Sequence, residues 1–317
     1  MVFPGPRLSI LIFHRVLSDP DPLQPGIIDV RGFARRMRWL KRFFRILPLA
    51  EAVERLQTGA LPQRAACLTF DDGYADNAEN ALPILNRLGI PATFFVATGY
   101  LDGGRMWNDT VIEAIRRWES PWLPLPGLDM DSIPVRTVEE RRLAIPKVLG
   151  LIKYLPPEHR QQICEEMASG VPGSLPKPMM GSEQVGELAA SGMDIGAHTR
   201  SHPILTRIPL TQARSEIEGS RKDLEAITGR SVTCFAYPNG KPGDDYAREH
   251  VNLVAELGFS AAVSTARGAA GKASHPLELP RFTPWDRTSA RFMARLLYTR
   301  LAGTRERAAS GRYPVGS

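Results

Sequence analysis

A chain of 317 residues is long enough for one large α/β domain or two ordinary ones, and either can bury a sizeable core. Hydrophobic residues make up 43% and charged residues 23%, which is typical of folded globular proteins and excludes a disordered or fibrous chain. The 40 Lys and Arg residues against 34 Asp and Glu give a net charge of +6, too small an excess to indicate a nucleic-acid-binding protein.

The N-terminus carries no recognisable export signal, because no basic stretch precedes an apolar run and His14 and Arg15 interrupt the run that is present. No window approaches the roughly 20 uninterrupted apolar residues of a membrane-spanning helix. The three cysteines are far apart and lack metal-type spacing. These features predict a cytoplasmic protein in a reducing environment.

Short apolar runs alternate with amphipathic stretches along most of the chain, which predicts parallel strands connected by helices. In the first of these helices Phe33, Met37, Leu40 and Phe44 share one face, and arginines and a lysine cover the rest. The candidate strands are 8–13, 66–70, 93–97, 193–197, 232–237, 259–264 and 277–282. The other candidate helices are 50–57, 76–88, 182–191, which opens with Ser182 as a cap, and 211–228.

The segment 101–180 is rich in proline and breaks this alternation. Candidate helices at 107–118 and 138–154 predict a helical and loop-rich insertion in a single domain of residues 1–317. In the tail, residues 288–317, Phe292, Leu296 and Thr299 share one face among arginines. This tail is expected to form a helix packed on the domain, with peripheral membrane contact as the alternative.

Seven strands alternating with helices fit either a barrel or an open doubly wound sheet, and in both folds functional residues gather at the carboxyl ends of the strands. In the first motif, LTFDDGY at 68–74, the second strand runs directly into two adjacent aspartates and a glycine. Its aspartates could form an ordinary turn with Asp72 or Asp76 as a helix cap. The same pair could also supply hydrolysis with a metal ligand and a base.

The second motif, DIGAHTRSHP at 194–203, places two histidines four residues apart after another strand. An isolated pair of this kind is usually a surface feature. Together with the aspartates, His198 and His202 instead predict a site of two histidines and one carboxylate, which leaves positions open for water and substrate. The third motif, CFAYPNG at 234–240, forms a turn in which Tyr237 and Asn239 are candidate substrate or oxyanion contacts.

Together the motifs resemble the polysaccharide deacetylases of carbohydrate esterase family 4, the NodB-homology domain. TFDDG at 69–73 matches the opening signature of the family, and HTRSH at 198–202 matches its His-Ser/Thr-x-x-His motif. IFHRV at 12–16 is similar to the start of the exopolysaccharide-associated members. The resemblance covers roughly 8–101 and 178–286.

The resemblance implies a distorted (β/α)7-type barrel and an enzyme that hydrolyses the acetamide of an N-acetylated carbohydrate, releasing acetate and a free amine. By position it assigns Asp72, His198 and His202 to a divalent metal, most often zinc, with cobalt, nickel or manganese as alternatives. Asp71 becomes the base. General metal chemistry supports this assignment, because a metal polarises a carbonyl and lowers the pKa of bound water toward about 7.

The chain departs from the family pattern in two places. Ala236 stands where the family has an arginine that orients the base, and we hypothesise that Arg281, at the end of the last strand, takes over this task. The usual acid histidine near the C-terminus is absent from its expected setting. His14 and His275 are the candidates for it. Trp107, Asn108 and Asp109 open the insertion and could place an aromatic ring and polar groups over the sugar, with packing of Trp107 in a core as the alternative.

Three other functions remain open at this stage. A deformylase acting on a lipid-linked formamido sugar would release formate instead of acetate. A non-haem iron oxygenase also uses two histidines and a carboxylate, but it has no need of the second aspartate. A catalytically inactive carbohydrate-binding homologue would bind sugar without turnover.

Overall fold

The computed structural model describes residues 6–125, 127–128, 130–284, 286 and 288–302. Seven parallel strands form its centre. In spatial order they are β1 (Ser9–Phe13), β5 (Ala65–Phe70), β6 (Thr93–Val96), β9 (Asp194–Ala197), β10 (Cys234–Ala236), β11 (Ala261–Arg267) and β12 (Leu279–Arg281). A short strand, β4 (Arg45–Ile46), extends the sheet beside β5.

The sheet nearly closes on itself, because the residue after β12 pairs with β1. The backbone N–H of Phe282 donates to the carbonyl of Ile10 at 2.7 Å, and Ile12 N–H donates to the carbonyl of Phe282 at 3.1 Å. This closure confirms the distorted (β/α)7-type barrel and excludes the open doubly wound sheet. The seven strands expected from the sequence are all present, with ends shifted by up to three residues.

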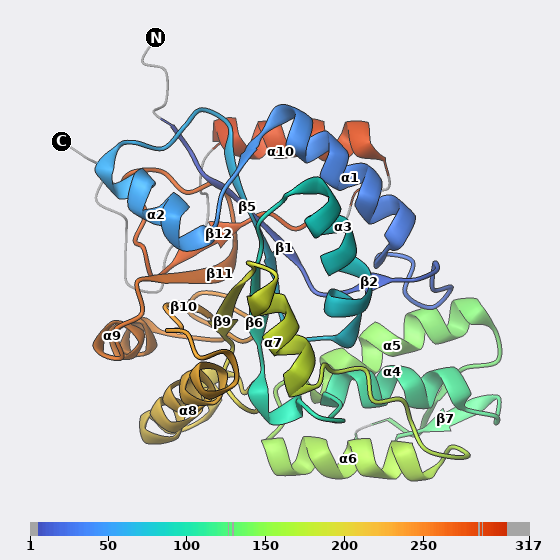
Figure 1. Ribbon diagram of the computed structural model, residues 1–317. Coiled ribbons are helices and arrows are strands. Elements are labelled where there is room, and N and C mark those ends of the chain that lie inside the picture. The colour runs from blue at the N-terminus through green and yellow to red at the C-terminus, as the bar shows by residue number, and fades with distance from the viewer. Residues whose placement is uncertain (1–5, 126, 129, 285, 287, 303–317) are drawn as a thin grey trace.

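Helices surround the barrel (Figure 1), and α1 illustrates why they form. Its residues Phe33, Met37 and Leu40 are fully buried on one face, and the N-cap Asp29 accepts a hydrogen bond from Gly32 N–H at 2.6 Å. Around the barrel lie α1 (Val30–Phe43), α2 (Leu49–Thr58), α3 (Leu82–Leu88), α7 (Ser182–Ala190), α8 (Leu210–Thr228) and α9 (Arg248–Glu256). The short strands β2 (Val16–Leu17) and β3 (Ile28–Asp29) pair with each other.

Two helix boundaries differ from expectation. The expected helix 76–88 is divided into a π-helical turn, Asn77–Ala81, and α3, and Asp76 makes no side-chain cap bond. Its carboxylate binds Arg15 instead. Ser182 is the first residue of α7 and not its cap. Gly181 occupies the cap position, while the Ser182 hydroxyl donates to Asp102 at 2.7 Å.

The insertion forms a compact unit at the lower right of Figure 1. It contains α4 (Trp107–Arg117), α5 (Val138–Ile152), α6 (Pro157–Ser169) and a hairpin of β7 (Trp122–Pro124) and β8 (Ser132–Pro134). A hydrophobic cluster of its own holds it together, including Val111, Ile115, Leu123, Val148 and Ile163. Because α6 was not expected from the sequence, the insertion is more helical than predicted.

The C-terminal helix α10 (Ser289–Ala302) packs on the barrel beside α1 (Figure 1). Phe292 and Leu296 are fully buried, and Arg300 donates to the backbone carbonyls of Arg7 and Ala65. Within the described part of the chain, no helix is long and apolar enough to cross a membrane.

Candidate metal centre and active site

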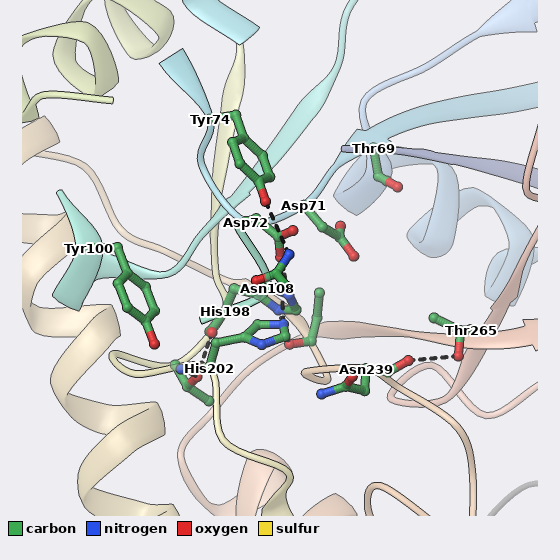
Figure 2. A network of polar contacts seen from close by, with 12 residues as sticks. Thr69, Asp71, Asp72, Tyr74, Tyr100, Asn108, His198, His202, Asn239 and Thr265 are labelled. Atoms are coloured by element: carbon green, nitrogen blue, oxygen red, sulfur yellow. Dashed lines mark hydrogen bonds and ion pairs between the residues drawn. The ribbon is translucent and has the colours of Figure 1, made fainter. Parts of the chain in front are cut away.

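The three sequence motifs meet at one end of the barrel. Asp71 and Asp72 follow β5, His198 follows β9, and Ala236 ends β10. Because parallel strands present their carboxyl ends at the same rim, residues far apart in the sequence become neighbours there. Figure 2 shows both aspartates above the two histidines.

Asp72, His198 and His202 converge on one point. Their ligand atoms all lie within 4.8 Å of one another, with each Nε2 close to Asp72 Oδ1, at 3.4 Å for His198 and 3.5 Å for His202. His198 Nδ1 lies 2.7 Å from the carbonyl oxygen of Ala236, which accepts a hydrogen bond from it and fixes the ring with Nε2 on the side of Asp72. The third motif therefore orients a ligand of the second.

The geometry and chemistry of these three residues fit a divalent ion. Burial, and next the charge of His198, lower the pKa of His202 to about 3, so this imidazole is neutral, as a metal ligand must be. His202 Nδ1 is buried without a hydrogen-bond partner. Although burial opposes it, the neighbouring carboxylates raise the pKa of His198, so this imidazole would release its proton when a metal binds. Two imidazole nitrogens and one carboxylate are a common donor set for zinc.

Strained backbone accompanies the site. Asp72 has φ +78°, Thr199 +63°, His202 +52° and Asn239 +58°, a left-handed conformation that side chains with a Cβ rarely adopt. Such strain persists only where surrounding contacts enforce it. Gly73, at φ +92°, is required for a second reason, because a Cβ there would lie 2.9 Å from Val96 Cγ1.

Arg281 holds Asp71 by a two-pronged ion pair in the interior. Each carboxylate oxygen accepts one guanidinium N–H at 2.7 Å, and both side chains are almost fully buried. The remaining donors of Arg281 bind the Ser264 carbonyl at 2.8 Å and the Thr69 hydroxyl at 3.2 Å. Burial alone would raise the pKa of Asp71, but the charge and hydrogen bonds of Arg281, together with the charge of His198, outweigh burial and lower that pKa. Asp71 is therefore held in its ionised form.

A pocket of about 380 Å³ opens over the metal centre. Trp107 and Asn239 line it, as does His14, whose side chain is exposed. Trp107 also packs against the core of the insertion. His275 lines neither this pocket nor the second cavity that adjoins it. The Nδ1 atom of His275 accepts a hydrogen bond from Leu277 N–H.

Tyr237 needs a correction. Its backbone N–H donates to the Val263 carbonyl at 3.2 Å, and its hydroxyl donates to the Leu277 carbonyl at 3.0 Å. The ring stacks on Tyr246 with centroids 3.9 Å apart. Because both donors are engaged in the sheet and the core, Tyr237 forms the pocket wall and supplies no oxyanion donor.

Asp109 was expected from the sequence only as one of the polar groups of WND over the sugar, and the structure shows it as a buried acid beside the site. Asp109, in the first turn of α4, is 4% exposed, and its donors are the Tyr74 hydroxyl, 3.1 and 3.2 Å from its two carboxylate oxygens, and the backbone N–H of Met106. Burial raises its pKa to about 7. The WND sequence that opens the insertion was the available signal, but nothing in it placed the aspartate next to Asp72.

This acid should make stability depend on pH. Between about pH 4 and 7 the folded protein keeps the proton on Asp109, whereas the unfolded chain releases it, so the free energy of unfolding falls as pH rises through this range. Asp109→Asn removes that dependence. We expect the free energy of unfolding of the variant, minus that of wild type, to increase by roughly 2–4 kcal/mol from pH 4 to pH 8, at about 1.4 kcal/mol per pKa unit. Urea unfolding at both pH values measures it, and a constant difference would contradict it.

Comparison with known proteins agrees with this geometry. A family model described as polysaccharide deacetylase matches residues 58–262. A putative polysaccharide deacetylase of Bacillus subtilis, YxkH, is 23% identical over 84% of this chain and 67% of its own length. The poly-β-1,6-N-acetyl-D-glucosamine N-deacetylase of Staphylococcus aureus is 37% identical over 90 residues, which span 28% of this chain and 31% of that enzyme.

Two solved structures share the fold. The Streptococcus pyogenes deacetylase PplD, in complex with acetate, has a TM-score of 0.63 at 19% identity, over 92% of this chain and 98% of that one. IcaB from Ammonifex degensii has a TM-score of 0.59 at 20% identity, over 93% and 98%.

The chain belongs to the polysaccharide deacetylase family. It is a hydrolase of the carbohydrate N-deacetylase class, as the motifs predicted, and the metal dependence of the family agrees with the cluster of Asp72, His198 and His202.

Proposed function

We propose that this protein removes acetyl groups from a polymer of N-acetylated amino sugars, with Asp72, His198 and His202 holding Zn²⁺. The observation that carries the proposal is the convergence of the three ligand atoms within 4.8 Å beside the paired Asp71. A divalent ion held there would polarise the acetamide carbonyl and acidify water. Cobalt, nickel or manganese could occupy the same donor set.

In this proposal the other residues divide the remaining tasks. Asp71, kept ionised by Arg281, takes a proton from the attacking water. His14 reaches the same pocket from the end of β1 and, as the general acid, gives a proton to the leaving nitrogen. Trp107 and Asn239 contact the sugar from the pocket walls.

A polymeric substrate is favoured by the relatives that act on poly-β-1,6-N-acetyl-D-glucosamine. Deformylation of a lipid-linked sugar is the second candidate, and identifying the released acid as acetate or formate distinguishes the two. The ion pair between Asp71 and Arg281 favours hydrolysis over an iron oxygenase, which needs no such base, and over an inactive binding protein.

We also propose that α10 contacts a membrane surface peripherally. Leu297, Tyr298 and Leu301 are 45%, 58% and 73% exposed on a helix that contains three arginines and no acidic residue. Cosedimentation with anionic lipid vesicles tests this contact. The cytoplasmic location stays a prediction.

Metal analysis tests the site without any assumption about the sugar. We expect the purified protein to contain close to one divalent ion per chain, and His198→Ala and Asp72→Ala to lose it. Acetate release from acetylated glucosamine oligomers should stop with a chelator and return with zinc. His275→Ala is the matched control, because this histidine lies outside the pocket. A parent protein that stays metal-free after incubation with zinc, cobalt or nickel would refute the proposal.

A further inference from the structure

A second cavity, of about 310 Å³, adjoins the active-site pocket. The two share His14, Asp72 and Asn108 in their walls, so the metal centre lies where they meet. Ligand pockets for small molecules begin at about 300 Å³, and each of these two reaches that size. Apart from His14 and Asp72, no residue of the second cavity has a role in the proposed reaction.

The walls of the second cavity suit a sugar ring, which has apolar faces and a polar edge. Isoleucines and a proline provide the apolar surface, and Tyr74, Gln24 and Asp109 provide polar groups. The apolar wall residues include Ile12, Ile27, Ile28, Ile112 and Pro284. These residues come from the barrel, from the loop between β2 and β3, and from the insertion.

Asp109 differs from the other buried aspartates near the active site. Asp71 is paired with Arg281, and Asp76 is paired with Arg15, with Nε 2.8 Å from Oδ2. Asp72 belongs to the metal cluster. Among the described residues no cation forms a salt bridge with Asp109, and both of its hydrogen-bond donors are neutral.

Arg15 also lines this cavity, and its charge lowers the pKa of Asp109, but its guanidinium is ion-paired with Asp76 and burial outweighs its effect, so the carboxyl pKa is raised to about 7. A buried carboxylate without a salt-bridge partner of its own is costly, and a cationic ligand would relieve that cost. Deacetylation itself produces such a cation, because the free amine of an amino sugar is protonated near neutral pH. An acetamide at the same position is neutral and larger.

We propose that the second cavity binds the sugar unit next to the one being deacetylated, and that Asp109 favours a free ammonium group on that neighbour over an acetamide. The inference rests on the proposed function and specifies its substrate further. With this preference, each deacetylation would promote deacetylation of the next sugar unit along the polymer. The enzyme would then produce runs of free amines instead of scattered ones.

Defined disaccharides test the preference at pH 7, where a large share of the amino-sugar amines is protonated. The fully acetylated disaccharide is compared with the two isomers that keep one acetyl group, so that the neighbour amine lies on either side of the target. We expect kcat/KM for one isomer to exceed kcat/KM for the fully acetylated disaccharide by about tenfold. This factor corresponds to the free energy of a charge-assisted hydrogen bond. In Asp109→Asn the ratio should fall to near one.

Glu113→Gln is the matched control, because it removes the same charge from the same helix at a residue paired with Arg116. It should keep the wild-type ratio. Equal kcat/KM values for all three compounds in wild type, or an unchanged ratio in Asp109→Asn, would overturn the inference.

A binding measurement separates this inference from the proposed function. Calorimetry of the metal-loaded protein with the fully deacetylated disaccharide should show binding that weakens about tenfold in Asp109→Asn. Acetate release from every compound at equal efficiency would refute only the inference. No acetate release from any of the acetylated compounds would refute the proposed function. The ratio of kcat/KM values measured on the wild-type enzyme tests the inference even if a variant fails to fold.

Discussion

Replacing Arg281 by alanine is expected to lower the free energy of unfolding by about 3–5 kcal/mol, the cost of leaving one partner of a buried ion pair alone. The guanidinium supplies both hydrogen bonds to Asp71 from a position that is 1% exposed. Without it, burial would raise the pKa of Asp71 and the carboxylate would lose its fixed orientation. We therefore also expect acetate release to fall by about 100-fold or more, the lower range for loss of a positioned base.

Arg281→Lys separates charge from geometry. Lysine keeps the positive charge but cannot form two parallel hydrogen bonds, so we expect this variant to recover part of the stability and little of the activity. Arg267→Ala, at an exposed residue of the preceding strand, is the comparison for general effects of removing an arginine. Urea unfolding and acetate release measure both consequences. Full turnover in Arg281→Ala would show that catalysis does not depend on Arg281.

The position of Arg281 illustrates what sequence can and cannot establish here. The LPRF sequence at a predicted strand end was enough to propose that its side chain reaches the barrel rim. That it reaches Asp71 depends on closure of the barrel through Phe282, which brings β12 beside β1 and within reach of the β5 end. Closure depends on long-range pairing, and no local pattern records it.

Residues in regular elements were easier to predict than residues placed by the insertion. Alternation of apolar runs gave the seven strands, and the motifs at their ends gave the metal cluster. Asp109 follows no such rule, because its location depends on how a separately packed helical unit docks against the barrel. Tyr237 lies in the pocket wall as expected, but its N–H and hydroxyl donate to Val263 and Leu277, far along the chain, and no local pattern indicates those partners.

Asp71→Asn is the second change with a large expected effect, because it removes the proposed base and keeps the shape. Proton transfer by a positioned side chain contributes about 10²–10⁴-fold, so we expect kcat to fall by this factor. Metal content should stay near that of wild type, since the ligand set is Asp72, His198 and His202. Stability should fall as well, because Arg281 loses its counter-charge in the interior.

Asp244→Asn is the control for this variant, at an exposed aspartate paired with Lys241. Elemental analysis and acetate release on the same preparations compare the two effects directly. A variant that loses turnover but keeps its metal assigns proton transfer to Asp71. A variant that loses both turnover and metal shows that Asp71 helps to position the metal ligands. Full turnover with metal retained would leave the metal site standing and transfer the role of base to another residue of the pocket, of which His14 is the first to test.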